Sequence, residues 1–197
     1  MAYATLAQLR EYLKLGAGET GDDTFLTNCL TRAQDFIEGA ECCNRVFEAS
    51  ADTTRSFFVQ RSVADDGLTL HLDYDLASAP TTVTNADGEV IPSTAYTLLP
   101  LNLTPKHSIK LKSTSGYVWQ YGDDPDNTIN IAAKWAYSLT APERIKTATL
   151  LLAKWLYRQK NATSEADNPI VAQGGFIIMP SKLPTAFWDM VSGYKRR

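Results

Sequence analysis

Near the start of the chain, apolar residues recur every three or four positions, which is the spacing of a helix with one buried face. Residues 5–8 have the pattern of a capping box, and apolar residues follow at helical spacing up to residue 13. After a Gly- and Asp-rich turn, a second stripe covers residues 26–37, and Asp22 or Asp23 is expected to cap it. The pattern predicts two helices joined by a short turn.

In the middle of the chain, the period changes from helical to alternating. Residues 67–74 place Leu at every second position with polar residues between, as a half-buried strand does. The dipeptide Asp87-Gly88 favours a hairpin turn. Further short runs follow, separated by Gly, Asp and Pro. Residues 54–137 are therefore predicted to form an antiparallel β module of five or six short strands.

A helical pattern returns over residues 142–160, and residues 140–143 have the sequence of a second capping box. Most apolar residues of this segment share one face. Leu150 and Leu151 lie off that face, as does Tyr157. A surface helix of a small domain is normally polar there, so these three side chains are expected to pack against a second surface.

The last part of the chain is a polar stretch followed by an apolar one. Residues 161–175 are polar and end in two glycines, whereas residues 176–194 are rich in aromatic and aliphatic side chains and are interrupted by Pro180 and Pro184. A flexible tether that carries hydrophobic anchors is typical of a docking arm. The alternative is that this segment folds back onto the chain's own core.

Together these patterns predict an α+β fold. Two N-terminal helices and one long C-terminal helix form a small bundle, with an inserted antiparallel β module and an extended C-terminal arm. The expected segments are a helical hairpin at 1–53, the β module at 54–137, a long helix completing the helical core at 138–162, and the tether with its docking arm at 163–197.

The overall charge is weakly acidic, with a net value of −3 over 197 residues. A protein that grips nucleic acid by its phosphates needs a concentrated basic surface, and the only basic cluster in the sequence is the terminal Lys195, Arg196 and Arg197. No apolar run approaches the roughly 20 residues of a membrane span. The amphipathic, partly acidic start of the chain is not typical of a signal peptide.

No arrangement of residues points to catalysis, a metal or a cofactor. Cys29, Cys42 and Cys43 lack the paired spacing of a zinc site, and Cys29 falls on the apolar face of a helix. Asp73 and Asp75 would share one face of a strand, but no basic residue adjoins them to tune a pKa. We therefore predict no catalytic residue, no metal ligand and no cofactor.

Four aromatic residues alternate along predicted strands, namely Trp119, Tyr121, Trp135 and Tyr137. A platform that stacks sugars or bases uses such a row. Nucleic-acid binding would also need interleaved basic residues, and only Lys134 is close. Packing in a core or an interface is the favoured interpretation.

The order of motifs along the chain resembles that of the head-to-tail adaptor (connector) proteins of tailed bacteriophages. The two N-terminal helices are followed by an Arg-x-Phe motif at Arg45 and Phe47, and residues 96–102 read Tyr-x-Leu-x-Pro-x-Asn. Residues 142–158 are similar to the family's helix that begins Pro-x-x-Ile and ends Trp-x-Tyr-Arg, and residues 183–197 are similar to its closing Leu-Pro, short helix and basic end. The resemblance covers nearly the whole length.

The resemblance implies a non-enzymatic structural protein of the virion neck, assembled in the host cytoplasm. Such adaptors form a dodecameric ring beneath the portal protein, extend the DNA channel and contact a stopper or tail-completion protein. DNA passes without sequence-specific binding, and no membrane is involved. The inter-subunit contact would include Leu150, Leu151, Tyr157 and Arg158. The arm would grip the portal or a neighbouring subunit through Phe176, Ile178, Met179, Leu183, Phe187, Trp188, Tyr194, Arg196 and Arg197.

Two other functions stay open at this point. A stopper or tail-completion protein belongs to the same kind of particle, but such proteins are more often small and β-dominated, and the flanking helices argue against this function. A carbohydrate- or nucleotide-binding module would use the aromatic strands, and it would need a pocket with converging polar groups.

Overall fold

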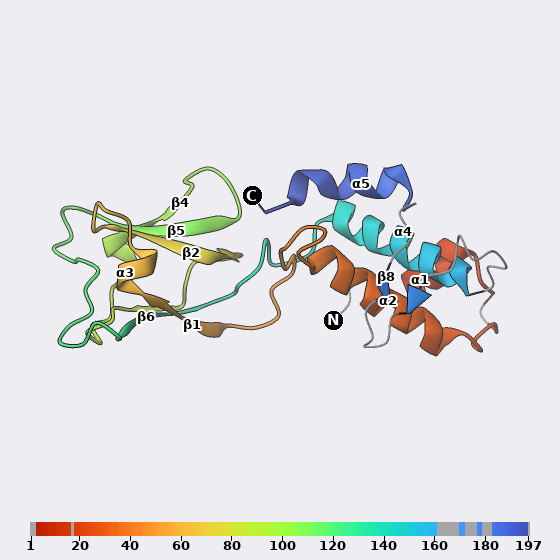
Figure 1. Ribbon diagram of the computed structural model, residues 1–197, viewed down its shortest axis with the longest axis horizontal. Coiled ribbons are helices and arrows are strands. Elements are labelled where there is room, and N and C mark those ends of the chain that lie inside the picture. Colours follow the sequence, from red (N-terminus) through yellow and green to blue (C-terminus); the bar gives the residue numbers. More distant parts are fainter. Residues whose placement is uncertain (1–2, 17, 161–169, 172–176, 179–182, 197) are drawn as a thin grey trace. The chain divides into compact units, whose positions relative to one another are not determined.

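The computed structural model describes residues 3–16, 18–160, 170–171, 177–178 and 183–196 (Figure 1). The chain divides into two compact units. We call Met1–Arg45 together with Pro142–Arg197 the helical unit, and Val46–Ala141 the β unit. Helices and antiparallel sheets are both present, which confirms the predicted α+β fold.

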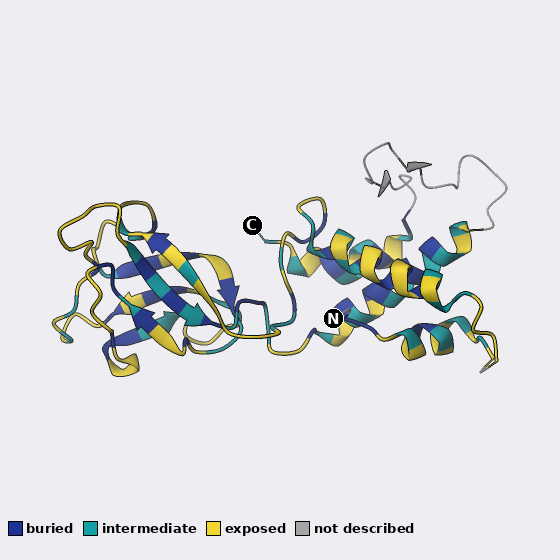
Figure 2. Ribbon diagram, turned by 90° about the horizontal axis from the view of Figure 1, so that it is seen from below, coloured by how far each residue is buried: buried dark blue, intermediate teal, exposed yellow. Residues whose placement is uncertain are grey.

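The helical unit is built from helices that come from both ends of the chain: α1 (Leu6–Leu13), α2 (Asp23–Glu38), α4 (Glu143–Gln159) and α5 (Thr185–Val191). Helices α2 and α4 lie side by side, and α4 also contacts α1 and α5 (Figure 1). Both α2 and α4 have one buried side and one exposed side, as their apolar spacing predicts (Figure 2).

The core of the helical unit is formed by the apolar stripes of these helices. Burial of one large aliphatic or aromatic side chain contributes about 1.5–3 kcal/mol to folding. The larger buried side chains are Leu9, Leu26, Leu30, Ile37, Ile145, Leu152, Leu156, Phe187 and Val191. Three short elements complete the unit. Ile170–Val171 (β7) pairs antiparallel with Ile177–Ile178 (β8), and a 3₁₀ turn (η2, Ser192–Tyr194) follows α5.

The helix ends agree with the sequence in one case and differ in two. At α1 the predicted capping box is present, since Thr5 and Gln8 bond to each other's backbone N–H. Asp22 is the N-cap residue of α2, but its side chain makes no capping hydrogen bond. The capping box predicted for α4 is wrong, because the helix begins at Glu143 with Pro142 as its N-cap, and Thr140 lies outside it.

The β unit consists of two three-stranded antiparallel sheets, with strand orders β1-β6-β3 and β2-β5-β4. This agrees with the predicted five or six short strands. A short helix (α3, Val59–Ser62) and a 3₁₀ turn (η1, Ser93–Ala95) lie between strands. The strands are β1 (Thr53–Phe58), β2 (Thr69–Leu76), β3 (Thr82–Thr84), β4 (Tyr96–Leu99), β5 (Lys106–Leu111) and β6 (Thr128–Ala133).

Strand β6 is the middle strand of its sheet and carries the centre of the core. Ile129 lies opposite Phe57 of β1, and Ile131 lies opposite Val83 of β3. Both isoleucines are fully buried. They belong to one hydrophobic cluster with residues of the other sheet, including Leu70. The two sheets therefore share a single core.

The alternation predicted for residues 67–74 holds in the first half of β2 and then changes phase. Leu70 and Leu72 are buried and His71 between them is exposed, but Tyr74 is exposed and Asp75 is buried. The pairing of β2 with β5 has a register shift between His71 and Leu76. A bulge of this kind adds a residue to one strand and so reverses the inward and outward positions that follow it.

The predicted hairpin turn at Asp87-Gly88 is present. Gly88 has φ +90°, which is the left-handed region that favours glycine, and its N–H donates to the Asn85 carbonyl at 2.9 Å. The strand ends on both sides are joined by a bridge between Thr84 and Val90.

The chain enters and leaves the β unit through segments that pair with each other. Glu48 and Ser138 form a parallel bridge, and the N–H of Tyr137 donates to the Val46 carbonyl at 2.8 Å. This pairing places the unit's boundaries at Val46 and Ala141, outside the predicted limits of 54–137.

Candidate functional site

The acidic and histidine side chains of the β unit do not form a catalytic cluster. Because of the bulge in β2, Asp73 is exposed and Asp75 is buried, so the carboxylate pair considered from the sequence does not share a face. His71 is exposed, and its Nδ1 is 3.2 Å from Ser108 Oγ. Among the described residues no group of His, Cys, Asp and Glu side chains could hold a metal ion.

The three cysteines are buried in the helical unit. Burial raises the pKa of the Cys29 thiol to about 11, so it is protonated at neutral pH and unreactive as a nucleophile. Cys42 Sγ and Cys43 Sγ lie 3.7 Å apart. The position of Cys29 in the core agrees with its place on the apolar face of α2.

The two tryptophans of the aromatic row are core residues. Trp119 donates its indole N–H to the Leu68 carbonyl and Trp135 donates to the Thr53 carbonyl, each at 2.8 Å. Both are buried, whereas Tyr121 is exposed. Trp119 and Tyr121 lie in a loop and not on a strand as expected. The row therefore does not form a flat stacking surface.

Within the part of the chain that the structure describes, no helix has the length and apolar character needed to cross a membrane.

The four residues predicted to contact a neighbouring subunit all lie on α4. Leu150 and Leu151 are half-buried, although they lie off the main apolar stripe. Tyr157 is half-buried as well, and its ring centroid lies 6.2 Å from that of Phe25 on α2. Arg158 is exposed. Packing within the helical unit thus accounts for part of the surface of Tyr157, and the exposed remainder of these four side chains is available to another molecule.

A polar network joins the C-terminal end of α4 to the start of α2. The Asp22 carboxylate accepts hydrogen bonds from the Tyr157 hydroxyl at 2.9 Å and the Lys160 ammonium at 2.6 Å. The bond from Lys160, followed by that from Tyr157, holds the pKa of the Asp22 carboxyl below its usual range. The same carboxylate raises the pKa of Tyr157 and of Lys160. This use of the Asp22 side chain explains why it does not cap α2.

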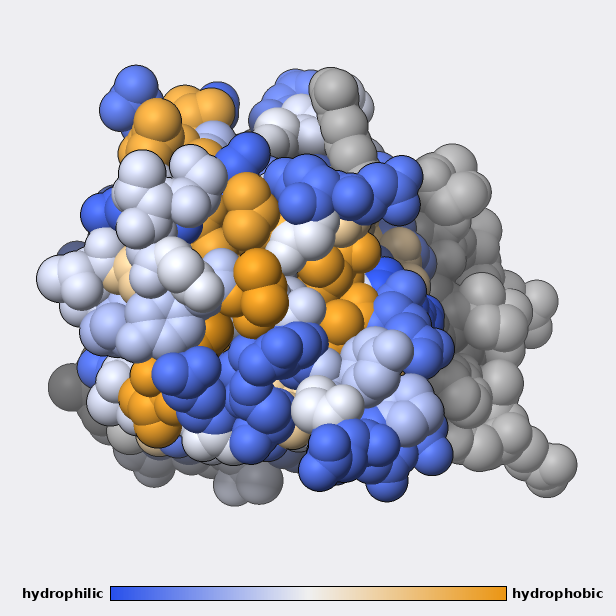
Figure 3. Space-filling model, turned by 90° about the vertical axis from the view of Figure 1, so that its left-hand side faces the viewer, coloured by the Kyte–Doolittle hydropathy of each residue, from blue (hydrophilic) through white to orange (hydrophobic). Residues whose placement is uncertain are grey.

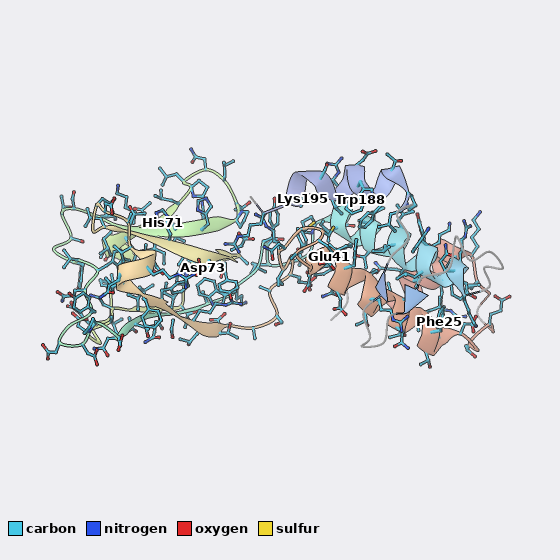
Figure 4. The ribbon with its side chains drawn as sticks, viewed as in Figure 1. Phe25, Glu41, His71, Asp73, Trp188 and Lys195 are labelled. Carbon is cyan, nitrogen blue, oxygen red and sulfur yellow. The ribbon has the colours of Figure 1, made fainter. Side chains whose placement is uncertain are left out.

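The described part of the predicted docking arm packs on its own unit. Leu183 and Phe187 are buried, and Phe187 lies 6.0 Å from Phe36 of α2 between ring centroids. The half-buried Trp188 also contacts Phe36, and Lys195 lies 5.5 Å from the Trp188 ring (Figure 4). In this part of the chain the segment folds back onto its own unit, which is the alternative that the sequence left open, and Leu183 and Phe187 are covered within the single chain.

The other predicted arm residues are placed only in part. Tyr194 and Arg196 are half-buried, and the backbone N–H of Arg196 donates to the Cys43 carbonyl at 3.0 Å. Phe176, Met179 and Arg197 lie outside the described residues, and Ile178 belongs to strand β8 without a described side chain.

The β unit has an exposed apolar loop that was not predicted from the sequence. Leu101 and Leu103, between β4 and β5, expose 65% and 67% of their surface. The Lys106 ammonium donates to the carbonyls of Pro100 and Leu101, which fixes one side of the loop. Figure 3 shows further apolar residues between hydrophilic ones on the surface of the molecule. The Tyr-x-Leu-x-Pro-x-Asn motif at residues 96–102 could have indicated this loop, because it places leucines next to a turn.

No protein-family model and no curated protein sequence matches the chain. Solved structures do share its fold. A chain from the neck of an empty gene transfer agent (GTA) particle, computed with C6 symmetry, matches with a TM-score of 0.60 and 14% identity, over 99% of this chain and 90% of that one. The chain has the fold of a GTA neck chain.

Two further structures of GTA particles agree with this match. A chain from the neck of the native particle, computed with C12 symmetry, gives a TM-score of 0.58 at 13% identity, over 98% of this chain and 88% of that one. A chain from the virion of the native particle gives 0.58 at 17% identity, over 99% and 90%. This shared fold is consistent with the resemblance of the sequence to head-to-tail adaptors.

Proposed function

We propose that this protein is a structural component of the neck of a phage-like particle and acts there as the head-to-tail adaptor. The observation that carries the proposal is the fold shared over 99% of the chain with a GTA neck chain. A match of this extent includes both units. In this role the protein joins the capsid vertex to the tail, extends the DNA channel beneath the portal and has no enzymatic activity.

The proposed assembly is a ring of twelve copies. The neck of the native GTA particle was computed with C12 symmetry, which supports this number. A ring needs a heterologous contact, in which two different surfaces of each copy meet. We assign one of these surfaces to α4, through Leu150, Leu151, Tyr157 and Arg158.

The charge of the chain suits a conduit for DNA. With a net charge of −3, the protein has no excess of basic groups to bind the phosphates tightly. DNA could then slide through the ring without sequence-specific contacts.

The proposed partners outside the ring are the portal protein and a stopper or tail-completion protein. The C-terminal segment is proposed to bind the portal or the neighbouring copy. The contact would be made by Phe176, Ile178, Met179 and the exposed parts of Trp188 and Tyr194. Large aromatic and aliphatic side chains often dominate the energy of such contacts. The complex would form in the host cytoplasm and remain in the virion neck.

The test is electron microscopy of the purified protein mixed with the portal ring from the same genome. We expect an additional twelve-fold layer stacked on the portal. Bare portal rings beside a folded protein would contradict the proposal. Binding only to preformed adaptor rings of another origin would instead identify a stopper.

A pair of variants on α4 sharpens this experiment. Leu151→Glu places a charge on the half-buried surface assigned to the neighbouring copy and is expected to abolish the layer. Thr147→Glu places the same charge on an exposed position of the same helix and is expected to leave the layer intact. Circular dichroism of both variants checks that the helices are retained.

A further inference from the structure

A hollow at one end of the helical unit is lined by basic and aromatic side chains from two distant parts of the sequence. Its volume is about 400 Å³. One wall comes from the end of α1 and the residues after it, and the other from the last turns of α4. We call this hollow the basic pocket; its lining residues are Tyr12, Leu13, Lys14, Leu15, Lys154, Tyr157 and Arg158.

The charge in the basic pocket is uncompensated among the described residues. Lys14, Lys154 and Arg158 make no ion pair with any residue that the structure describes, whereas other basic groups of the helical unit do. Arg10 pairs with Asp23, and Lys160 pairs with Asp22. Asp22 and Asp23 are therefore already occupied, and none of the three cations that line the hollow has an ion-pair partner among the described residues.

The walls of the pocket are held in place before anything binds. Lys14 adopts a left-handed conformation with φ 59°, and its N–H donates to the end of α1. The Tyr157 ring is fixed by the hydrogen bond from its hydroxyl to Asp22 and by Phe25. The Lys154 ammonium lies 4.8 Å from the Tyr12 ring centroid. A pocket that is formed in advance loses less conformational entropy when it binds a partner.

The β unit carries an exposed loop of opposite charge. Asp123, Asp124 and Asp126 are all exposed, and no described cation pairs with them. The loop has a defined shape, because the N–H of Asp126 donates to Asp124 Oδ1 at 2.9 Å and the N–H of Asn127 donates to the Asp124 carbonyl at 3.1 Å. We call residues 122–127 the acidic loop.

We propose that the basic pocket of one copy of this chain binds the acidic loop of a second copy. Three cations face three carboxylates, and the tyrosines of the pocket offer an apolar surface to Pro125. Both surfaces are present on every copy and differ from each other, which is what a head-to-tail contact requires. The inference rests on the proposed function only in taking the two copies to be neighbours in the ring.

The contact should depend on charge. Close charge pairs across an interface couple by about 1.5 kcal/mol or more, which corresponds to roughly a tenfold change in affinity for each pair. Salt screens such pairs, with a Debye length of about 10 Å at 0.1 M and about 3 Å at 1 M. Self-association is therefore expected to weaken as ionic strength rises.

The first test is charge reversal with restoration. The pocket variant Lys154→Glu/Arg158→Glu and the loop variant Asp123→Lys/Asp124→Lys are each expected to lower the fraction of portals that carry a complete layer by at least about tenfold. A chain that carries all four changes is expected to recover most of this loss. The control Arg32→Glu/Arg144→Glu changes the charge equally at exposed positions elsewhere on the helical unit and should assemble as the unmodified protein does.

The second test detects the contact without a portal. Arg158→Cys is placed in one copy and Asp124→Cys in another copy of different size, and the two are mixed under mild oxidation. The native cysteines are buried, so a disulfide-linked pair of unequal copies reports the proposed contact. Thr147→Cys in place of Arg158→Cys is the control and should give no such product.

The outcomes separate this inference from the proposed function. If the unmodified protein forms the layer and the pocket variant does so equally well, the inference is overturned and the adaptor role stands. If no layer forms but the cross-link does, the adaptor role fails and the contact stands. If the pocket variant forms the layer normally and loses only affinity for duplex DNA, the pocket binds the DNA phosphates, and the inference is overturned as well.

Discussion

The helical unit and the β unit each bury a continuous core, but the elements that complete the two cores occupy different positions. In the helical unit this element is α5, a short outer helix that covers α4 and contributes Phe187. In the β unit the last strand is β6, which lies between β1 and β3 and contributes Ile129 and Ile131. Damage to an outer layer should remain local, whereas damage to a middle strand should spread to both neighbours.

The largest effect is expected for Phe187→Ala. Removal of a fully buried ring lowers the free energy of unfolding by about 3–5 kcal/mol. Hydrogen exchange measured by mass spectrometry should show faster exchange in α5 and unchanged exchange in the β unit. The exposed Thr185→Ala on the same helix is the control. Equal exchange in the variant and the unmodified protein would mean that α5 does not complete this core.

Ile131→Ala tests the other side of the comparison. Loss of this side chain from the middle strand is expected to cost about 2–5 kcal/mol, measured by urea denaturation. Faster hydrogen exchange is expected in β1, β3 and β6 together, because β6 pairs with both of the others. Faster exchange confined to β6 would contradict the proposed difference between the two units.

Thr5→Ala is expected to lower the free energy of unfolding of the helical unit by a smaller amount. The substitution removes the acceptor for the Gln8 N–H at the start of α1, and loss of such a cap costs about 1 kcal/mol. Thr5→Ser keeps the hydroxyl and should retain most of the stability. Thermal unfolding of the two variants measures the difference, and equal melting temperatures would show that the cap contributes nothing.

The smallest effect is a pH dependence at Asp22. Its pKa is lowered in the folded protein by Lys160 first and Tyr157 second. The stabilising contribution is therefore present above the unfolded-state pKa of about 3.9 and is lost as pH falls through the lower folded value. Asp22→Asn should reduce the loss of thermal stability below about pH 4. The exposed Asp189→Asn is the control, and identical pH profiles for all three proteins would exclude the linkage.

Local patterns predicted the helices and strands well, but they did not show which of the capping sequences caps a helix. Thr5 and Thr140 have the same capping sequence, and only Thr5 caps a helix. Before α4, the backbone is held by the β unit instead, because Glu48 accepts the N–H of Ala141 and Ser138 donates to the Thr140 carbonyl. The contact between Glu48 and Ala141 joins residues that are distant in sequence and therefore leaves no local signal.

The same limit applies to the candidate site. The C-terminal segment was interpreted as a docking arm because a polar stretch precedes its hydrophobic side chains, with folding back onto the core as the alternative. Only its packing against Phe36 shows that α5 belongs to the core. The basic pocket was missed because Lys14 and Lys154 are brought together by the contact between α1 and α4. The alternation in β2 was predictable up to the bulge after His71 and not beyond it.

The bridge between Glu48 and Ser138 brings the entry and exit of the β unit next to each other. An insertion whose ends meet can be exchanged for another, longer or shorter, without moving the ends of the host helices. The β unit can therefore diverge or be replaced during evolution while the helices that border it keep one geometry. In the laboratory, the same position is a natural site for grafting a fluorescent protein or an affinity tag.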